Sequence, residues 1–350
     1  MKTDIKGLTY EQLNNAVIDL GLPKFRTKQI FQWLHHSGCT FFDEMTNISK
    51  DLRLKLSEHF YIGNCFIEDK YVSKLDNTVK YLFRLADGEY IESVIMKYKY
   101  GYTICVSSQV GCKMGCTFCA STLAGFKRNL TAGEIESQIH TAQKDLDIRI
   151  SHIVMMGIGE PLDNFENVIA FLDNVNNENG LNISMRNVTI STCGIVPKIY
   201  DLMDYNLQLT LTISLHAPND AIRSSSMPIN NKYPIDEVIE ACKVYAKKTG
   251  RRVSFEYTVI KNVNDSEINA KELAYRLKDM ACHINLIPLN NVKERSNVSV
   301  SREEMLKFQN VLKKHGINAT IRRTLGSDIN ASCGQLRRLK KRGEFDENCC

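Results

Sequence analysis

The sequence lacks a long apolar run: no stretch approaches the ~18 consecutive apolar residues that a membrane-spanning helix needs. Its first dozen residues also lack the apolar core of a signal peptide. Internal repeats and low-complexity tracts do not stand out. Charged residues make up 24% of the chain, close to the globular norm, which excludes wholesale disorder. We therefore expect a cytoplasmic, globular protein with no membrane partner.

A strong excess of one charge is missing as well, since 45 Lys and Arg face 40 Asp and Glu, a net charge of +5. This mildly basic balance permits a nucleic-acid partner without requiring one. The 350 residues fit one large domain or two ordinary ones, at ~150 residues per domain.

Cysteine, by contrast, is abundant, with 12 residues. A chain of this length buries a core without disulfides, and a reducing compartment disfavours them. Five cysteines stand alone in apolar or loop context and are interpreted as small buried residues: Cys39, Cys65, Cys193, Cys242 and Cys282. Two more, Cys349 and Cys350, end the sequence and are expected to be exposed. The remaining five carry the functional interpretation: Cys105, Cys112, Cys116, Cys119 and Cys333.

The first hundred residues predict a small helical module followed by a hairpin. Thr9 and Gln12 form a capping box before a helix, and two more short helices are expected near Trp33 and over 51–60. The period then changes to two over 79–85, and Asp87-Gly88 supplies a turn before 90–96.

From about residue 102 the chain alternates strands and helices. Strands are predicted over 102–106, 153–156, 188–191, 209–215, 253–259, 283–289 and 319–322. Helices are predicted to start near Thr131, Asn164, Pro197, Ile235, Ser266 and Ser301. Repeated βαβ units imply a parallel sheet with helices outside it, here a full or partial (β/α) barrel. Ligands of such sheets gather at the carboxyl ends of the strands.

Three thiols follow the first of these strands within eight residues: Cys112, Cys116 and Cys119. Structural zinc is the conservative interpretation, but zinc takes four ligands and no fourth is evident nearby. His140 is interpreted as an ordinary surface or core histidine on a helix. Three thiolates from one loop suit an iron–sulfur cluster that leaves one iron open for chemistry.

The spacing of these cysteines after the first strand resembles that of the radical S-adenosylmethionine (SAM) superfamily. In that superfamily a [4Fe-4S] cluster binds SAM through its open iron and cleaves it to a 5′-deoxyadenosyl radical. The stretch Gly157-Ile-Gly-Glu-Pro161 follows the second strand. It is either a tight turn or the GGE-type SAM motif of the superfamily, and beside the cysteine loop we favour the SAM motif.

Seven ordered motifs resemble the RlmN family of dual-specificity RNA (adenine-C2) methyltransferases, from about residue 20 to 336. They are Cys105-Val-Ser-Ser-Gln-Val-Gly-Cys112, Gly-Ile-Gly-Glu-Pro-Leu at 157–162, Ser191-Thr-Cys-Gly, Ser214-Leu-His-Ala, Met227-Pro-Ile-Asn, His283-Ile-Asn-Leu-Ile-Pro and Asp328-Ile-Asn-Ala-Ser-Cys333-Gly-Gln-Leu. The resemblance implies a partial barrel of radical SAM type with a small amino-terminal helical and hairpin module. It further implies methylation of adenosine-2503 in 23S rRNA and of adenosine-37 in tRNA.

The resemblance also implies roles for single residues. Cys333 would carry a methyl group from a first SAM, and a second SAM would supply the radical that activates this methyl group. Cys105 would then release the methylated base and leave a transient disulfide with Cys333, while Glu92 would accept a proton. The implied cluster ligands are Cys112, Cys116 and Cys119. The implied SAM contacts are Gly159, Glu160, Ser191, Ser214, Leu215, His216 and Asn290.

These motifs depart from the family pattern at four positions: Ile158, Cys193, Asn291 and Ser332. None of the four removes a required group. Without the resemblance, Glu92 would be interpreted as a strand-surface carboxylate.

The expected division is an amino-terminal accessory module over 1–97, a radical SAM core over 98–336 and a basic tail over 337–350. The tail begins with a dense basic run that is either a solvated segment or a phosphate contact, and its position after Cys333 favours contact. The implied partners of a monomeric chain are 23S rRNA, tRNA and an electron donor such as flavodoxin. Two rivals remain: the sister family of C8-adenine methyltransferases (Cfr), and a non-catalytic RNA-binding protein with a zinc loop.

Overall fold

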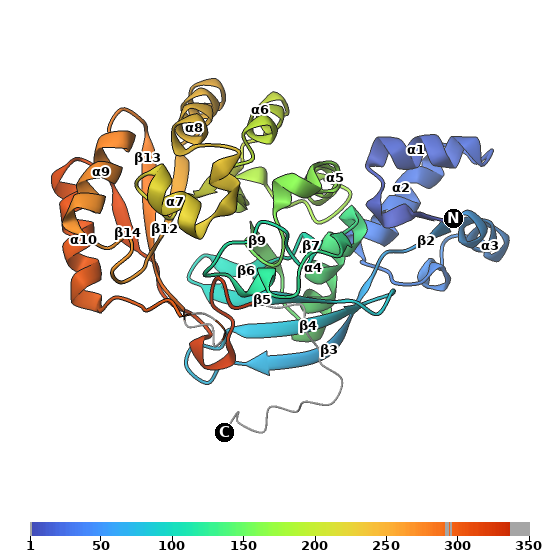
Figure 1. Ribbon diagram of the computed structural model, residues 1–350. Helices are drawn as coiled ribbons and strands as arrows, with labels where there is room; N and C mark the ends of the chain where they lie inside the picture. Colours follow the sequence, from blue (N-terminus) through green and yellow to red (C-terminus); the bar gives the residue numbers. More distant parts are fainter. Residues whose placement is uncertain (1, 291–293, 295, 337–350) are drawn as a thin grey trace.

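The computed structural model describes residues 2–290, 294 and 296–336, and a ten-stranded sheet forms its centre. The strands run in the order β14-β13-β12-β11-β10-β9-β6-β5-β4-β3 (Figure 1). Their bounds are β3 Cys65–Val72, β4 Val79–Leu85, β5 Tyr90–Tyr98, β6 Gly101–Cys105, β9 Ile150–Met155, β10 Val188–Thr192, β11 Thr210–Ser214, β12 Val253–Val259, β13 Cys282–Pro288 and β14 Ala319–Ile321.

The seven strands predicted from residue 102 onward pair in parallel, from β6 through β9 to β14. The sheet is open, with β14 at one edge and β3 at the other, so the predicted partial (β/α) barrel is confirmed. Helices connect these strands: α4 Ala132–Leu146, α5 Phe165–Asn176, α6 Val196–Asp204, α7 Asp220–Ser226, α8 Ile235–Thr249, α9 Glu267–Leu277 and α10 Arg302–Lys314. The helix starts predicted near Thr131 and Ser301 are confirmed, and a capping box is formed at each.

The predicted hairpin is β4 with β5, and β5 continues directly into the parallel sheet through an antiparallel pairing with β6. The sheet therefore runs across the division expected at residue 97, which stays a prediction. The tenth strand of the sheet, β3, is not predicted from the sequence. It is the edge strand, and most of its residues are exposed, so it carries no clear alternation of apolar and polar side chains. The short α7 was not predicted either.

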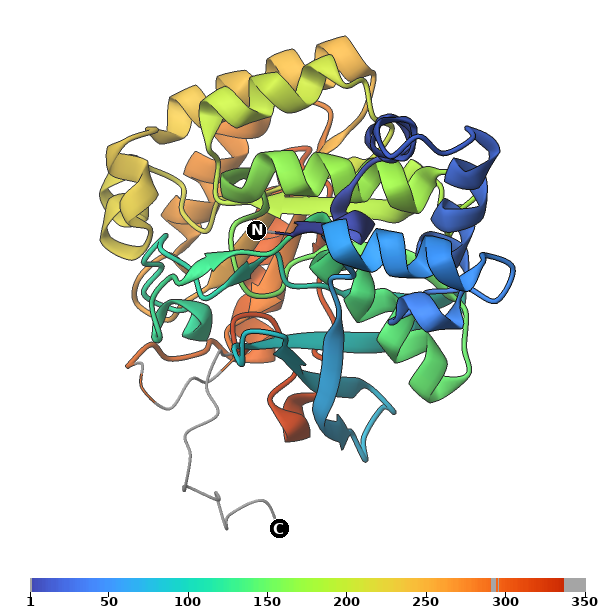
Figure 2. The same cartoon turned by 90° about the vertical axis from the view of Figure 1, so that its right-hand side faces the viewer.

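The amino-terminal helices are α1 Tyr10–Asp19, α2 Phe25–Phe31 and α3 Lys50–His59, as the sequence predicts. The capping box of Thr9 and Gln12 is formed. Their apolar side chains form a core of their own, including Leu13, Ile30 and Leu56. Figure 2 shows these helices, in blue, beside the green helices of the larger body. Among the described residues, no helix is long and apolar enough to cross a bilayer.

A buried polar network joins these helices to α4. The Glu136 carboxylate lies 2.8 Å from His35 Nδ1 and 3.0 Å from His140 Nε2, and none of the three side chains is appreciably exposed. The Lys6 ammonium donates to Ser137 Oγ of α4 at 2.9 Å. His140 is thus a core histidine, one of the two roles expected for it, and α4 is the helix on which the amino-terminal part rests.

This network predicts a pH dependence of stability. Burial lowers the pKa of His140 from 6.5 to about 4, with Lys6 acting in the same direction. Between those pH values the unfolded chain binds the extra proton, so the free energy of unfolding falls on acidification from 6.5 to 4. The slope for one such group is at most about 1.4 kcal/mol per pH unit. Urea unfolding across this window should therefore show a weaker pH dependence for His140→Gln, which keeps a donor for Glu136. Parallel curves for the two chains would rule out His140 as a source of the dependence.

Candidate active site

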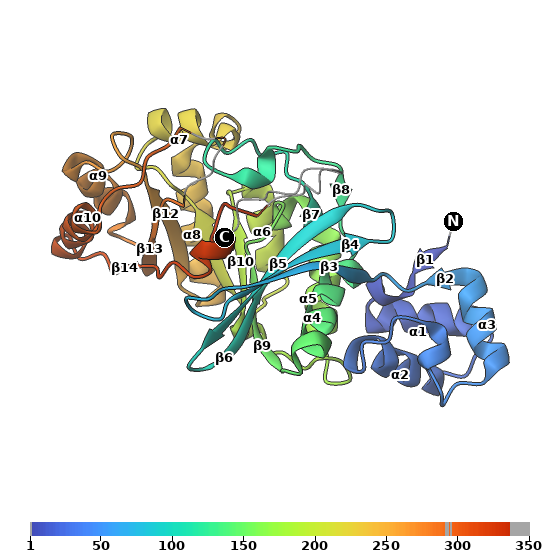
Figure 3. The same ribbon diagram turned by 90° about the horizontal axis from the view of Figure 1, so that it is seen from below.

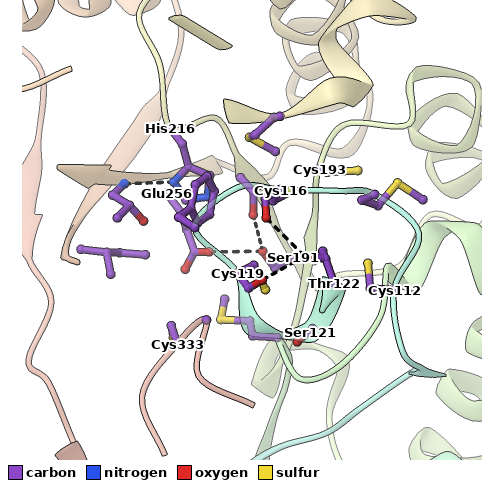
Figure 4. Close-up of a pocket in the computed structure, with 18 of the residues that line it drawn as sticks. Cys112, Cys116, Cys119, Ser121, Thr122, Ser191, Cys193, His216, Glu256 and Cys333 are labelled. Atoms are coloured by element: carbon purple, nitrogen blue, oxygen red, sulfur yellow. Dashed lines mark hydrogen bonds between the residues drawn. The ribbon is translucent and has the colours of Figure 1, made fainter. Parts of the chain in front are cut away.

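A pocket opens at the carboxyl ends of the parallel strands, where the sequence places its ligand site. Its empty volume is about 920 Å³, open solvent included. Residues from eight separate stretches of the chain line it, and Figure 4 shows many of them around one space. They include Cys112, Cys116, Cys119, Gly157, Gly159, Glu160, Ser191, Cys193, Ser214, His216, Glu256, Asn290 and Cys333.

The three-cysteine loop is fixed by hydrogen bonds of its own backbone. Thr117 N–H donates to the Ser226 carbonyl at 2.9 Å, which ties the loop to the end of α7. Thr122 Oγ1 donates to the Cys119 carbonyl at 2.9 Å. At Gly111, just before the loop, φ is +76°, and a Cβ atom would lie 1.7 Å from the Gly125 carbonyl oxygen. Only glycine fits there. The loop therefore presents its thiols from a fixed backbone.

The donor set fits an iron–sulfur cluster. Burial raises the pKa of Cys112 to about 12, and burial followed by the charges of Cys119 and Cys112 raises that of Cys116. Such thiols stay protonated until a cation displaces the proton, as iron does. Among the described residues, no three His, Cys, Asp or Glu side chains surround a single-ion position. A cubane cluster places its thiolates on different irons, so its ligands need not meet at one point.

The Gly157–Pro161 turn is packed tightly against the loop that follows β6. Cβ atoms on Gly157 and Gly159 would lie 2.6 Å from Val106 O and from Gln109 Cβ, respectively. The N–H groups of Gly157, Ile158 and Glu160 all donate within the protein. Close packing is therefore enough to require both glycines. The turn also lines the pocket.

Glu160 is buried, and burial raises its pKa. Its two oxygens accept hydrogen bonds from Leu162 N–H at 3.0 Å and from Cys193 N–H at 2.8 Å. The carboxylate therefore fixes two loops of the pocket. Cys193, interpreted from the sequence as an isolated buried thiol, is buried and also faces the pocket.

Ser191 and Ser214 end neighbouring strands, and their hydroxyl oxygens lie 3.3 Å apart. Ser191 Oγ also donates to Glu256 Oε2 at 3.3 Å, and Arg322 Nη1 donates to Glu256 Oε1 at 2.8 Å. This arrangement gives the pocket a polar wall of hydroxyls, next to an ion pair in which Glu256 is buried and Arg322 is partly exposed. The sequence interpretation missed both Glu256 and Arg322, because a single Glu or Arg inside a strand carries no motif.

The other three predicted SAM contacts differ in position. His216 lines the pocket, and burial lowers its pKa to about 3, so the ring is neutral; its Nδ1 accepts from Thr258 N–H at 2.9 Å. The Asn290 amide donates to the Cys333 carbonyl at 3.0 Å. The Leu215 side chain is buried in the hydrophobic core, and its backbone N–H donates to the Glu256 carbonyl.

The segment that carries Cys333 packs against Cys105 in one apolar cluster. Cys333 lines the pocket, whereas Cys105 ends β6 and packs in a cluster with Val94, Ala331 and Leu336, the last two from the Cys333 segment. Both thiols are free. Burial, then the charge of Cys333, raises the pKa of Cys105 to about 12. Burial also raises the pKa of Cys333, and Arg322 opposes this shift.

Glu92 is not the surface carboxylate that its sequence context alone predicts. It is buried in β5, and one of its oxygens lies 3.3 Å from Lys80 Nζ. Val94, two residues further along β5, pairs with Cys105 across the strands. Because side chains two apart share a face, Glu92 lies on the Cys105 face of the sheet.

A third missed residue is Arg223 of α7, whose side chain is fully buried. Its guanidinium donates to the carbonyls of Cys193 at 2.6 Å, Leu215 at 3.3 Å and Ser214 at 3.5 Å. It also donates to Asn230 Oδ1 at 3.0 Å. Arg223 therefore holds the ends of β10 and β11 together on the floor of the site.

Comparisons with known proteins agree with this geometry. Residues 3–62 match the family model "Ribosomal RNA large subunit methyltransferase N-terminal domain", and residues 106–274 match "Radical SAM superfamily". A protein of Alkaliphilus oremlandii named "Probable dual-specificity RNA methyltransferase RlmN" is 55% identical over 337 residues, covering 96% of this chain and 98% of the relative. A relative of the same name in Clostridium novyi is 53% identical over 335 residues, covering 96% and 98%.

A crystal structure of a radical SAM methyltransferase from Sphaerobacter thermophilus superposes with a TM-score of 0.91 at 41% identity. The match covers 96% of this chain and all of that one. The similarity thus spans the amino-terminal helices, the sheet and the pocket together. The chain belongs to the RlmN family of RNA methyltransferases within the radical SAM superfamily.

Proposed function

We propose that this chain adds a methyl group to C2 of adenosine in two RNAs, at adenosine-2503 of 23S rRNA and at adenosine-37 of tRNA. One observation supports this most directly: Cys333 shares a pocket with the three loop cysteines and packs its segment against Cys105. The C2 carbon of adenine is electron-poor and no nucleophile, so displacement alone cannot methylate it. Two cysteines beside a radical source make the reaction possible, because one can carry a methyl group that the radical activates and the other can release the methylated base.

Cys112, Cys116 and Cys119 would hold a [4Fe-4S] cluster, with SAM bound beside it and two SAM molecules used per turnover. The cluster supplies an electron that cleaves SAM to a radical able to abstract hydrogen. Ser191 and Ser214 offer hydroxyls, and Asn290 an amide, to the hydroxyl and carboxylate groups of SAM. Gly159, Glu160 and His216 line the same pocket, and Leu215 contacts Glu256, another lining residue, through its backbone N–H.

Cys333 would carry the methyl group as a thioether and, once a hydrogen is removed, join its carbon to the base. The radical adduct would then lose one electron to the cluster and the C2 hydrogen as a proton. Cys105 would attack the Cys333 sulfur, and the bond from that sulfur to the transferred carbon would break, its electron pair going to the carbon, which takes up a proton. A Cys105–Cys333 disulfide would remain for external reduction. Burial keeps Cys105 protonated at neutral pH, so its proton must leave before the attack. Glu92, on the same face of the sheet, is the proposed proton acceptor.

Anaerobic reconstitution with iron and sulfide, followed by SAM, a reductant and adenine-containing RNA, tests this proposal. Nuclease digestion and mass spectrometry should yield 2-methyladenosine. A product of 8-methyladenosine would assign the chain the activity of the sister Cfr family instead. Bound zinc with neither product would leave an RNA-binding protein. We further propose a monomeric, cytoplasmic enzyme that draws electrons from a donor such as flavodoxin.

RNA contact by the basic run after Cys333 predicts a salt effect. Arg337 and Arg338 lie outside the described residues, so their role rests on the sequence alone. Reversing both charges, with glutamate in place of each arginine, should weaken RNA binding and flatten the dependence of log Kd on log salt by about 1–2 units, since each phosphate contact contributes ~0.9. Filter binding at several salt concentrations measures this slope. Equal slopes for both chains would contradict the contact.

A further inference from the structure

The segment that carries Cys333, residues 323–336, forms hydrogen bonds with the turn between β3 and β4, residues 73–78. In Figures 1 and 3 the red segment before residue 336 lies beside the light-blue strands of that hairpin. Regular structure in this segment is limited to one short 3₁₀ turn, Ser327–Ile329, so its position depends on what it touches.

Two aspartates link the turn and the segment reciprocally. Asp328 of the segment accepts from Ser73 Oγ at 2.7 Å and from Lys74 N–H at 2.9 Å, both in the turn. Asp76 of the turn accepts from Gly326 N–H of the segment at 2.9 Å. Each side thus gives a carboxylate to a backbone N–H of the other, and hydrogen bonds to a charged acceptor are the stronger kind.

The residues around these hydrogen bonds are closely packed, with no room for a side chain at Gly326. Gly326 has φ +61°, and a Cβ atom there would lie 2.7 Å from Ala331 Cβ and 3.0 Å from Thr78 Cγ2. Lys80 Nζ donates to the Asn330 carbonyl at 3.4 Å. The hydrogen bond from Ser73 lowers the pKa of Asp328, so this carboxylate is charged at neutral pH.

We propose that Asp76 and Asp328 form a clamp that positions Cys333 for reaction with Cys105. Beyond the clamp, Ala331 and Leu336 of the segment pack with Cys105 itself, so fixing one end of the segment fixes the approach of the two thiols. The two aspartates are positioning residues, which act through the segment. The inference rests on the Cys105–Cys333 exchange proposed above, and it gives the edge hairpin a function.

The test measures the effective concentration of the Cys105 thiol toward the Cys333 thiol, in the full chain without cofactor. The background replaces Cys349 and Cys350, and also the three loop cysteines Cys112, Cys116 and Cys119, by serine, to remove thiols that would compete for Cys333. In a glutathione buffer, one glutathione disulfide oxidises the two protein thiols to a Cys105–Cys333 disulfide and is itself reduced to two glutathione molecules. Alkylation of the remaining thiols and peptide mass spectrometry give the oxidised fraction at each buffer ratio.

Asp76→Asn and Asp328→Asn keep the shape of the side chain and remove one carboxylate acceptor. Each should lower the effective concentration about five- to tenfold, and the double variant further, because pre-organisation is lost. Ser73→Ala, which removes one donor, should lower it about two- to threefold. Asp204→Asn is the matched control, since Asp204 pairs with Lys248 on the helices outside this segment.

Two results would overturn the clamp while leaving the Cys105–Cys333 exchange intact. One is an equal effective concentration in the Asp76, Asp328 and Asp204 variants. The other is a lower melting temperature with an unchanged effective concentration, which would make the aspartates stabilising residues only. If the background chain itself forms no Cys105–Cys333 disulfide, the exchange step fails and the clamp fails with it, a result distinct from the first two.

Discussion

A chain with Cys105→Ala is expected to stop with its Cys333 sulfur covalently joined to RNA through the transferred carbon. Cys105 packs in the apolar cluster that also holds Ala331 and Leu336 of the Cys333 segment. Without its thiol, nothing at that position attacks the Cys333 sulfur to release the base. Release should fall by more than about a hundredfold, as expected for loss of a nucleophile. Denaturing gels and mass spectrometry would detect an RNA–protein species that a thiol reductant does not remove.

Cys282→Ala provides the matched control. Cys282 starts β13 and pairs with Val253 at the start of β12, so it lies at the end of the strands remote from the pocket. This variant should turn over normally and accumulate no adduct. Clean turnover by Cys105→Ala would refute the resolving role, and an adduct in both variants would show that it arises without regard to Cys105.

The architecture was predictable where local signals repeat. The sequence predicts a strand over 253–259, and Val253–Val259 is a fully buried strand. It also predicts a helix start near Thr131, where Thr131 and Glu134 form the capping box of α4. Seven such strands in sequence, with helices between them, leave a parallel sheet as the outcome. The edge strand β3 was not predicted, because only one of its sides pairs with another strand and most of its side chains face water. Amphipathic alternation is weak where there is little to bury.

The residues of the candidate site also fall into two groups: those that a sequence motif marks and those that only the folded structure reveals. The loop cysteines and Cys333 stood out because a spacing or motif marks them, and the structure brings them to one pocket. Glu256 and Arg322 could not be found, because their significance lies in a 2.8 Å contact between side chains 66 residues apart in the sequence. Arg223 is similar: its importance comes from the three carbonyls it binds, which belong to the ends of other strands. Contacts of this kind exist only after folding.

Cys333→Ala is expected to abolish RNA methylation and also to suppress the adduct of the Cys105 variant. Cys333 is half-buried on a segment with little regular structure, so losing its sulfur should change the fold little. The methyl group would then have no acceptor in the protein, and the fall in product should exceed about a thousandfold.

Methyl-labelled SAM separates the two roles. Label should appear on the protein with Cys105→Ala and be absent from it with Cys333→Ala and with the double variant, which should form no adduct. The order of events decides this result, because an attack on the Cys333 sulfur presupposes that this sulfur carries the methyl group. Methylated adenosine from Cys333→Ala would place the methyl group on another residue. An adduct in the double variant would place the covalent bond to RNA elsewhere.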